Sequence, residues 1–150
     1  MTGPLHEVRV IELAGLGPAP FCSMVLADLG AQVLRIDRPS ATPPTEERSN
    51  AWDVLNRNRR GVAVDLRSED GAAFVRELAS TADVLVEGFR PGVAERLGLG
   101  PDALSSLHPR LVYGRMPGWG PGSYPHLRAH ETVPGLRCRL LLFNQKSVRN

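Results

Sequence analysis

The sequence predicts an α/β fold in which an open sheet of parallel strands carries helices on both faces. Short runs rich in β-branched residues alternate along the chain with segments whose apolar residues recur at helical spacing. That alternation is typical of a parallel sheet covered by helices. The 150 residues, 42% of them hydrophobic and 23% charged, suit one ordinary globular core. We therefore expect a Rossmann-like domain.

The first two strands and the helix between them are predicted from residues 8 to 36. The first strand is expected at residues 8–13, before a turn rich in glycine and proline. A helix is predicted to begin near Pro20 and to stop at Gly30, because apolar residues recur there at helical spacing. The second strand, at residues 32–36, is followed closely by Pro39, which disfavours helix in the residue before it.

A polar loop at residues 40–60 separates this unit from the rest of the predicted sheet. Ser68 is expected to cap a helix whose first turn holds Glu69 and Asp70, as the helix dipole favours. Right-handed crossovers place the loops that follow strands along one edge of the sheet, the usual ligand crevice of open α/β folds. The remaining elements are predicted as strands at 62–66, 83–86 and 111–116 and as short helices beginning at Pro91 and Pro101.

The distribution of charge divides the chain at Gly120. Up to that residue there are 13 Arg and no Lys against 15 acidic residues, whereas the remainder holds five basic residues and only Glu131. The sequence predicts a half-domain at residues 1–120 and a divergent basic tail at residues 121–150. That tail is expected to be a partly ordered extension, or the result of a chain that ends early or leaves its reading frame near Gly120.

Composition argues against several classes of protein. No stretch is long and apolar enough for a membrane span and the N-terminus lacks a signal-peptide pattern, so we expect a cytoplasmic protein without membrane contact. A formal charge of +2, four Phe and two Tyr give little support for nucleic-acid binding. Two cysteines without C-x-x-C spacing do not indicate a disulfide framework or a metal site.

The first glycine-rich turn invites comparison with a dinucleotide-binding fingerprint. Gly15 and Gly17 follow a predicted strand, and Asp37 lies twenty residues beyond Gly17, at the end of the next one. Pro18 and Pro20, however, remove backbone N–H donors where the fingerprint needs them to approach a pyrophosphate. Nicotinamide binding is therefore disfavoured, and a tight turn without a ligand stays open as an alternative.

Arginines cluster near the ends of the predicted strands. Arg38 and Arg90 follow strands, and Arg59 belongs to a group with Arg57 and Arg60 just before one. Guanidinium groups suit phosphate because their planar donors engage two oxygens at once and their charge does not titrate. We expect these arginines to converge at one edge of the sheet around a phosphate-bearing ligand, although each could instead be an ordinary solvated cation.

Several sequence blocks, taken in order, resemble a known family. They include Glu12-Leu-Ala-Gly-Leu-Gly-Pro18 and Arg35-Ile-Asp-Arg-Pro39, with further blocks at residues 56–60, 83–92, 96–100 and 109–113. Over about residues 5–120 the chain is similar to the N-terminal part of the α-methylacyl-CoA racemases, within the family III CoA-transferases. The two quoted blocks favour the racemase branch.

The resemblance implies an acyl-CoA partner, with no cofactor beyond the CoA moiety of the substrate. By similarity, Arg38 and Arg90 are expected to contact CoA, with Leu16, Asn58 and Arg59 nearby in the same crevice. Full-length relatives are expected to be interlocked homodimers.

The implied reaction removes the proton α to the thioester carbonyl and returns it on the opposite face, so it needs a base and an acid on opposite sides of a planar enolate. Racemases use a His in a Gly-His-Asp segment, and the nearest equivalent here is His130 in Arg128-Ala-His-Glu131. His130 could equally be a surface histidine. Because the second acid is expected beyond the end of this chain, a complete active site is not expected. A CoA-transferase fragment and a non-catalytic CoA-binding remnant remain alternatives.

Overall fold

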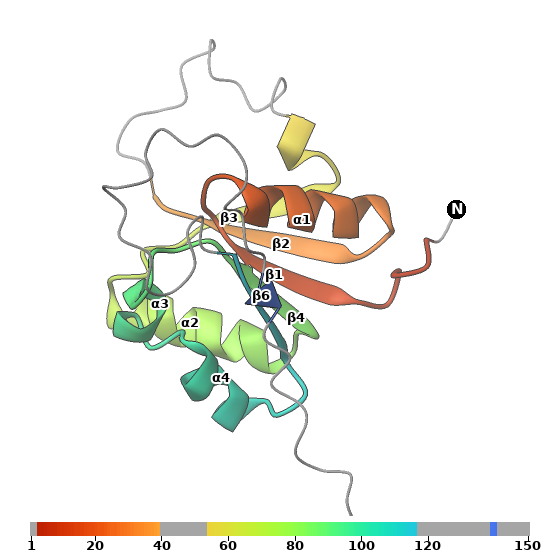
Figure 1. Ribbon diagram of the computed structural model, residues 1–150. Coiled ribbons are helices and arrows are strands. Elements are labelled where there is room, and N and C mark those ends of the chain that lie inside the picture. The colour runs from red at the N-terminus through yellow and green to blue at the C-terminus, as the bar shows by residue number, and fades with distance from the viewer. Residues whose placement is uncertain (1–2, 40–53, 117–138, 141–150) are drawn as a thin grey trace, which may run out of the picture.

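A computed structural model describes residues 3–39, 54–116 and 139–140, which form one sheet flanked by helices (Figure 1). Five parallel strands and a sixth, antiparallel one lie in the order β3-β2-β1-β4-β5-β6. The chain moves outward from β1 in one direction and then returns to begin β4 on the other side of β1. This reversal of strand order is the switch point at which open α/β sheets usually bind ligands. The strands are β1 (Arg9–Leu13), β2 (Gln32–Asp37), β3 (Arg59–Ala63), β4 (Val84–Glu87), β5 (Val112–Arg115) and β6 (Arg139–Leu140).

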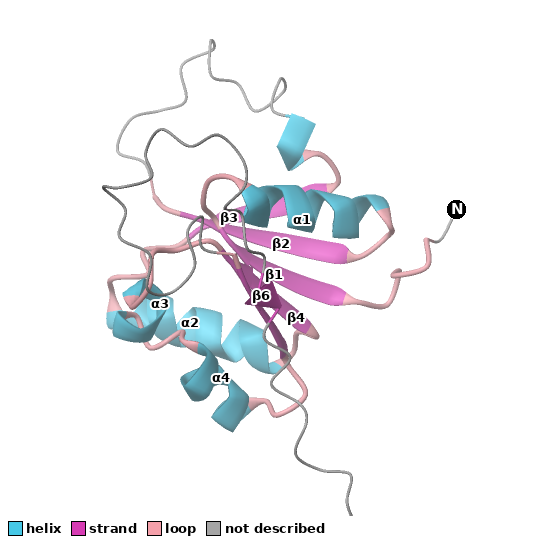
Figure 2. Ribbon diagram, viewed as in Figure 1, coloured by secondary structure: helices cyan, strands magenta, loops and turns pink. Residues whose placement is uncertain are grey.

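Helices cover both faces of the sheet, as the sequence predicts (Figure 2). On one face lies α1 (Pro18–Asp28), with the short 3₁₀ helix η3 (Val54–Asn56) beside it. On the other lie α2 (Glu69–Ser80), α3 (Val93–Arg96) and α4 (Pro101–Leu107). Along the described ranges, no helix is long and apolar enough to cross a membrane.

Alternation along the strands divides the core into two layers, because successive side chains of a strand point to opposite faces. Val10 and Val86 pack with Ala19 and Ala27 of α1. Ile11 and its neighbours face the other way, toward the helices that follow β3 and β4. That second layer contains Leu13, Ile36, Val75, Ala79, Leu85, Leu99, Leu104 and Tyr113.

Residues at the start of α2 explain why the helix begins there. The Ser68 hydroxyl accepts a hydrogen bond from the backbone N–H of Gly71 at 3.0 Å, so the expected cap is present. Gly71 is required there, because a Cβ atom at this position would lie 2.1 Å from the carbonyl oxygen of Asp65. Val75 and Ala79 then lie on the buried face of the helix.

The third strand differs from its prediction. It spans Arg59–Ala63, whereas the sequence predicts it at residues 62–66. The sequence Arg59-Arg-Gly61 has little strand character, but pairing with β2 aligns Arg59 with Val33 and Ala63 with Asp37. Tertiary pairing therefore overrides local preference at this edge strand.

The predicted tail contributes to the sheet through β6, which pairs antiparallel with β5. The sheet is therefore not parallel throughout. The rest of residues 121–150 lies outside the described residues, so the boundary at Gly120 stays a prediction.

Replacing Leu85 with alanine tests the core. Leu85 is fully buried in β4, so Leu85→Ala is expected to lower the free energy of unfolding by about 2–5 kcal/mol. Leu107→Ala, at a side chain that is 57% exposed, is the matched control and should cost well under half as much. Urea denaturation followed by circular dichroism measures both; equal losses would contradict the assigned packing.

Candidate functional site

A hollow of about 510 Å³ lies at the carboxyl edge of the sheet, beneath α3. It is built from residues that follow four different strands, because parallel strands all end at the same edge. Phe89, Val93 and Leu97 supply an apolar wall. The described residues that line it are Ala14, Ile36, Arg38, Val64, Asp65, Leu66, Arg67, Phe89, Val93, Arg96 and Leu97.

Three arginines give the hollow a positive character. Arg38 follows β2, Arg67 follows β3 and Arg96 lies on α3, whereas Asp65 is the only acidic residue among the described residues of the lining. All three arginines are exposed, and none forms an ion pair with a residue in the described ranges. The hollow therefore combines uncommitted guanidinium groups with an apolar wall.

Leu16 and Arg90 lie at the same edge but outside the lining of the hollow. Leu16 is 92% exposed in the turn between β1 and α1, and Arg90 is exposed in the turn after β4. These two turns pack closely, since a Cβ atom at Gly88 would lie 3.7 Å from the carbonyl oxygen of Leu16. The structure thus places Leu16, Arg38 and Arg90 at one edge, although only Arg38 enters the hollow.

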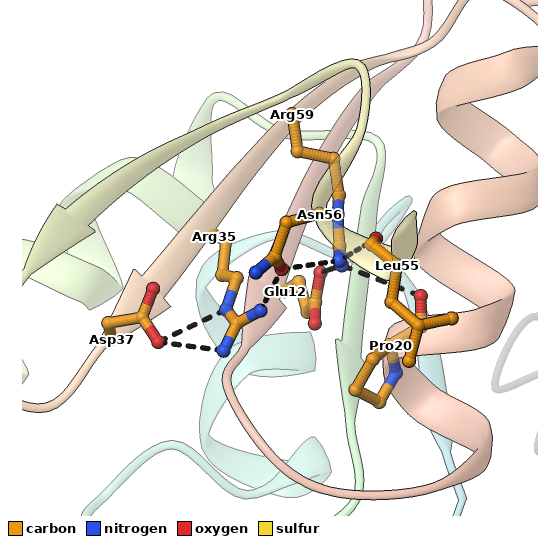
Figure 3. A network of polar contacts seen from close by, with 7 residues as sticks. All are labelled: Glu12, Pro20, Arg35, Asp37, Leu55, Asn56 and Arg59. Carbon is orange, nitrogen blue, oxygen red and sulfur yellow. Dashed lines mark hydrogen bonds and ion pairs between the residues drawn. The ribbon is translucent and has the colours of Figure 1, made fainter. Parts of the chain in front are cut away.

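Arg59 points instead beneath α1, where it pairs with Glu12 (Figure 3). Both side chains are essentially fully buried, at 1% and 0% exposure. The Arg59 guanidinium also donates to the backbone oxygen of Leu55 and, at 2.8 Å, to Asn56 Oδ1. Since its Nη1 and Nη2 groups donate to protein acceptors beneath α1, the expected convergence of Arg59 with Arg38 is wrong.

A second arginine extends this buried polar network (Figure 3). Arg35 Nη1 donates to Asn56 Oδ1, and its Nη2 lies 2.9 Å from Asp37 Oδ1. Burial raises the pKa of the Glu12 carboxyl above its ordinary value, and the charge of Arg59 opposes that rise. The network joins β1, β2, β3 and η3 on the α1 face of the sheet.

Asn58 lies at the opposite, amino edge of the sheet, so its predicted place beside Arg38 is also wrong. Asn58 Nδ2 donates to Asp28 Oδ1 at 2.9 Å, and Arg57 Nε donates to the same atom at 3.0 Å. Asp28 is the last residue of α1, and the hydrogen bond from Arg57 holds the pKa of its carboxyl below the ordinary value. The physical reason is direct: residues that precede a parallel strand lie at the edge opposite to residues that follow one.

A buried acid cluster adjoins the hollow, and the sequence analysis did not single it out. Glu87, at the end of β4, is 1% exposed and interacts with Arg115 at the end of β5. Burial raises the pKa of the Glu87 carboxyl. The sequence does carry a signal for Glu87, namely a carboxylate at the end of an otherwise apolar strand.

The sequence analysis did not single out Arg67 and Arg96 either, although Arg67 directly follows a predicted strand.

His130 falls outside the described residues, so its place is not known. Within the ranges that the structure does describe, no group of three His, Cys, Asp or Glu side chains could hold a metal ion.

Comparison with known proteins identifies the family. The family model described as CoA-transferase family III matches residues 5–140, most of the chain and well past Gly120. The chain belongs to CoA-transferase family III.

Members of CoA-transferase family III that resemble the chain include both racemases and transferases. The α-methylacyl-CoA racemase of Homo sapiens is 45% identical over 130 residues, covering 85% of this chain and 32% of the relative. The succinyl-CoA–D-citramalate CoA-transferase of Chloroflexus aurantiacus is 39% identical over 125 residues, covering 78% of this chain and 31% of the relative. The chain therefore spans about one third of the length of the curated relatives it matches.

Solved structures agree with the assignment to CoA-transferase family III. A CAIB/BAIF family protein from Brucella suis superposes with a TM-score of 0.72 and 32% identity, over 83% of this chain and 36% of that one. Rv3272 from M. tuberculosis, in its orthorhombic form, gives a TM-score of 0.71 and 30% identity, over 94% and 46%.

A double-mutant cycle tests the buried Glu12–Arg59 pair. Glu12→Gln or Arg59→Met alone is expected to cost about 3–5 kcal/mol of unfolding free energy, because each leaves its partner buried and uncompensated. The double variant should cost clearly less than the sum, as urea titration would measure. Arg57→Met removes a half-exposed arginine and is the control. Additive losses in the cycle would argue against direct coupling.

Proposed function

We propose that the chain binds the CoA part of acyl-CoA thioesters in the hollow at the carboxyl edge. The observation that carries this proposal is the group of uncommitted arginines, Arg38, Arg67 and Arg96, which converge there from three different elements. CoA carries a diphosphate and a 3′-phosphate, and planar guanidinium forks suit both. The apolar wall around Phe89 gives the uncharged parts of the ligand a surface to pack against. Arg90, exposed at the same edge, is a further candidate contact for a phosphate.

We infer that this chain supplies the CoA site of an α-methylacyl-CoA racemase. Its base removes the proton α to the thioester carbonyl and leaves a planar enolate, and an acid on the opposite face returns a proton with inverted configuration. His130 is the candidate for one of these groups. The 45% identity to the human racemase supports this branch.

A CoA-transferase is the second candidate, supported by the 39% identity to the citramalate CoA-transferase. Such an enzyme moves CoA between two carboxylic acids, so it needs a free acid as co-substrate. A non-catalytic CoA-binding module is the third candidate, from a different functional class. All three share the CoA site, and they differ only in the chemistry done on the acyl group.

One pair of assays separates these candidates. A chiral 2-methylacyl-CoA in deuterated water should gain deuterium at the α carbon with a racemase, without any added acid. CoA transfer that appears only when a free carboxylic acid is added would instead assign a transferase. CoA binding without either reaction would assign a binding module. Mass spectrometry of the recovered thioester measures both reactions.

Arg38→Ala tests the proposed binding site. Loss of a charge-assisted hydrogen bond to phosphate is expected to weaken CoA binding by about 1.5–3 kcal/mol, or roughly tenfold to 150-fold. Arg90→Ala should act in the same direction. Arg57→Ala, at the opposite edge and paired with Asp28, should leave CoA affinity unchanged. Isothermal titration calorimetry with CoA measures all three; unchanged affinity in both Arg38→Ala and Arg90→Ala would refute the site.

A further inference from the structure

Glu87, Arg115 and Glu95 form a group of ion pairs beside the hollow that joins two strands to the loop after β4. We call this group the Arg115 clamp. Glu87 Oε1 accepts a hydrogen bond from Arg115 Nε at 2.6 Å, and Glu87 Oε2 accepts one from the backbone N–H of Phe89 at 2.6 Å. The first contact crosses from β4 to β5, where the two residues are direct register partners. The second fixes the direction in which the chain leaves β4. Both oxygens of one buried carboxylate are thus used to orient neighbouring groups.

Arg115 extends the clamp to α3. Its Nη2 donates to Glu95 Oε1 at 2.7 Å, while its guanidinium carbon lies 5.7 Å from the centre of the Tyr113 ring. The hydrogen bond from Arg115 holds the pKa of the Glu95 carboxyl below its ordinary value. Tyr113 in turn donates from its hydroxyl to the Leu99 carbonyl at 2.9 Å, just beyond α3. Arg115 is therefore held between two carboxylates and an aromatic ring.

The segment held by this clamp forms one wall of the hollow. Phe89, Val93, Arg96 and Leu97 all line it, and Arg96 is adjacent in sequence to Glu95. Helix α3 has only four residues and no side-chain cap. A single helical turn does not hold its own shape in water, since nucleation is unfavourable. The position of this wall must therefore be set by tertiary contacts, of which the Arg115 clamp is the polar part.

We propose that Glu87, Arg115 and Glu95 are positioning residues for coenzyme binding, because they orient the Phe89–Leu97 wall of the hollow. They act through Phe89 and Arg96 and do not themselves line the hollow. This inference rests on the proposed function, because it concerns the same hollow and the same ligand.

Glu95→Gln is the main test, since Glu95 is the exposed arm of the clamp and the variant is expected to fold. It should raise the CoA dissociation constant about threefold to tenfold, the scale of indirect coupling between neighbouring sites. Glu95→Asp keeps the charge and should recover part of the lost affinity. Glu77→Gln removes an exposed carboxylate of α2 outside the clamp and should change nothing. Calorimetry with CoA measures each variant.

A second readout separates positioning from stability alone. In ¹⁵N-labelled protein, Glu95→Gln should shift the amide resonances of Phe89 and Arg96, while the amides of α2 stay in place. Glu87→Gln should move the Phe89 resonance further, because that amide donates to the carboxylate directly. Unchanged Phe89 and Arg96 resonances, or CoA affinity in Glu95→Gln equal to that of the unaltered protein, would overturn the inference.

Failure of the inference is distinguishable from failure of the proposed function. If the unaltered chain does not bind CoA, or binds it equally well after Arg38→Ala and Arg90→Ala, the proposed site is wrong. If CoA binds and Arg38→Ala weakens it while the clamp variants do not, the site stands and only the positioning role fails.

Discussion

The buried ion pair between Glu12 and Arg59 constrains more of this structure than any other polar contact in its described part. Neither side chain reaches water, and taking two charges out of water is costly unless other hydrogen bonds complete the site. Here Leu55, Asn56 and Pro20 supply acceptors around the guanidinium. The pair therefore requires β1, β3, η3 and the start of α1 to be in place together. It stabilises one specific arrangement of an edge strand whose own sequence barely favours a strand.

Seven arginines of the described residues fall into two groups with different roles. Arg35, Arg57, Arg59 and Arg115 are engaged by carboxylates, and they join secondary-structure elements. Arg38, Arg67 and Arg96 face a hollow with a single acidic residue in its lining. Because a guanidinium that is already paired has little left to offer an anion, the second group is the one that we propose attracts a phosphate-bearing ligand. Pairing, more than position in the sequence, separates the structural arginines from the proposed binding ones.

Sequence reasoning succeeds where the signal is local. Ser68 caps α2 through its own hydroxyl, and alternation along β1 and β4 separates two apolar layers whatever the partner strands are. It fails for β3, because the start of that strand depends on pairing with β2. A different error misplaces Asn58 and Arg59: both come just before or at the start of β3, and residues that precede a parallel strand lie at the edge opposite to residues that follow one. Only residues that follow strands, such as Arg38 and Arg67, gather at the ligand edge.

Three properties follow from the amino-acid sequence alone: the order of strands and helices, the edge at which a ligand would bind, and the family resemblance. Each depends on periodicity, on helix- and strand-ending residues or on motif order within short segments. The tertiary structure decides which arginines are neutralised and which remain open toward the hollow. The deciding contacts join residues as far apart as Glu12 and Arg59 or Glu87 and Arg115. Folding brings such pairs together, and the energy of a buried charge depends on its neighbours in space. For that reason Arg59, which resembles a phosphate ligand in the sequence, becomes part of the framework in the folded protein.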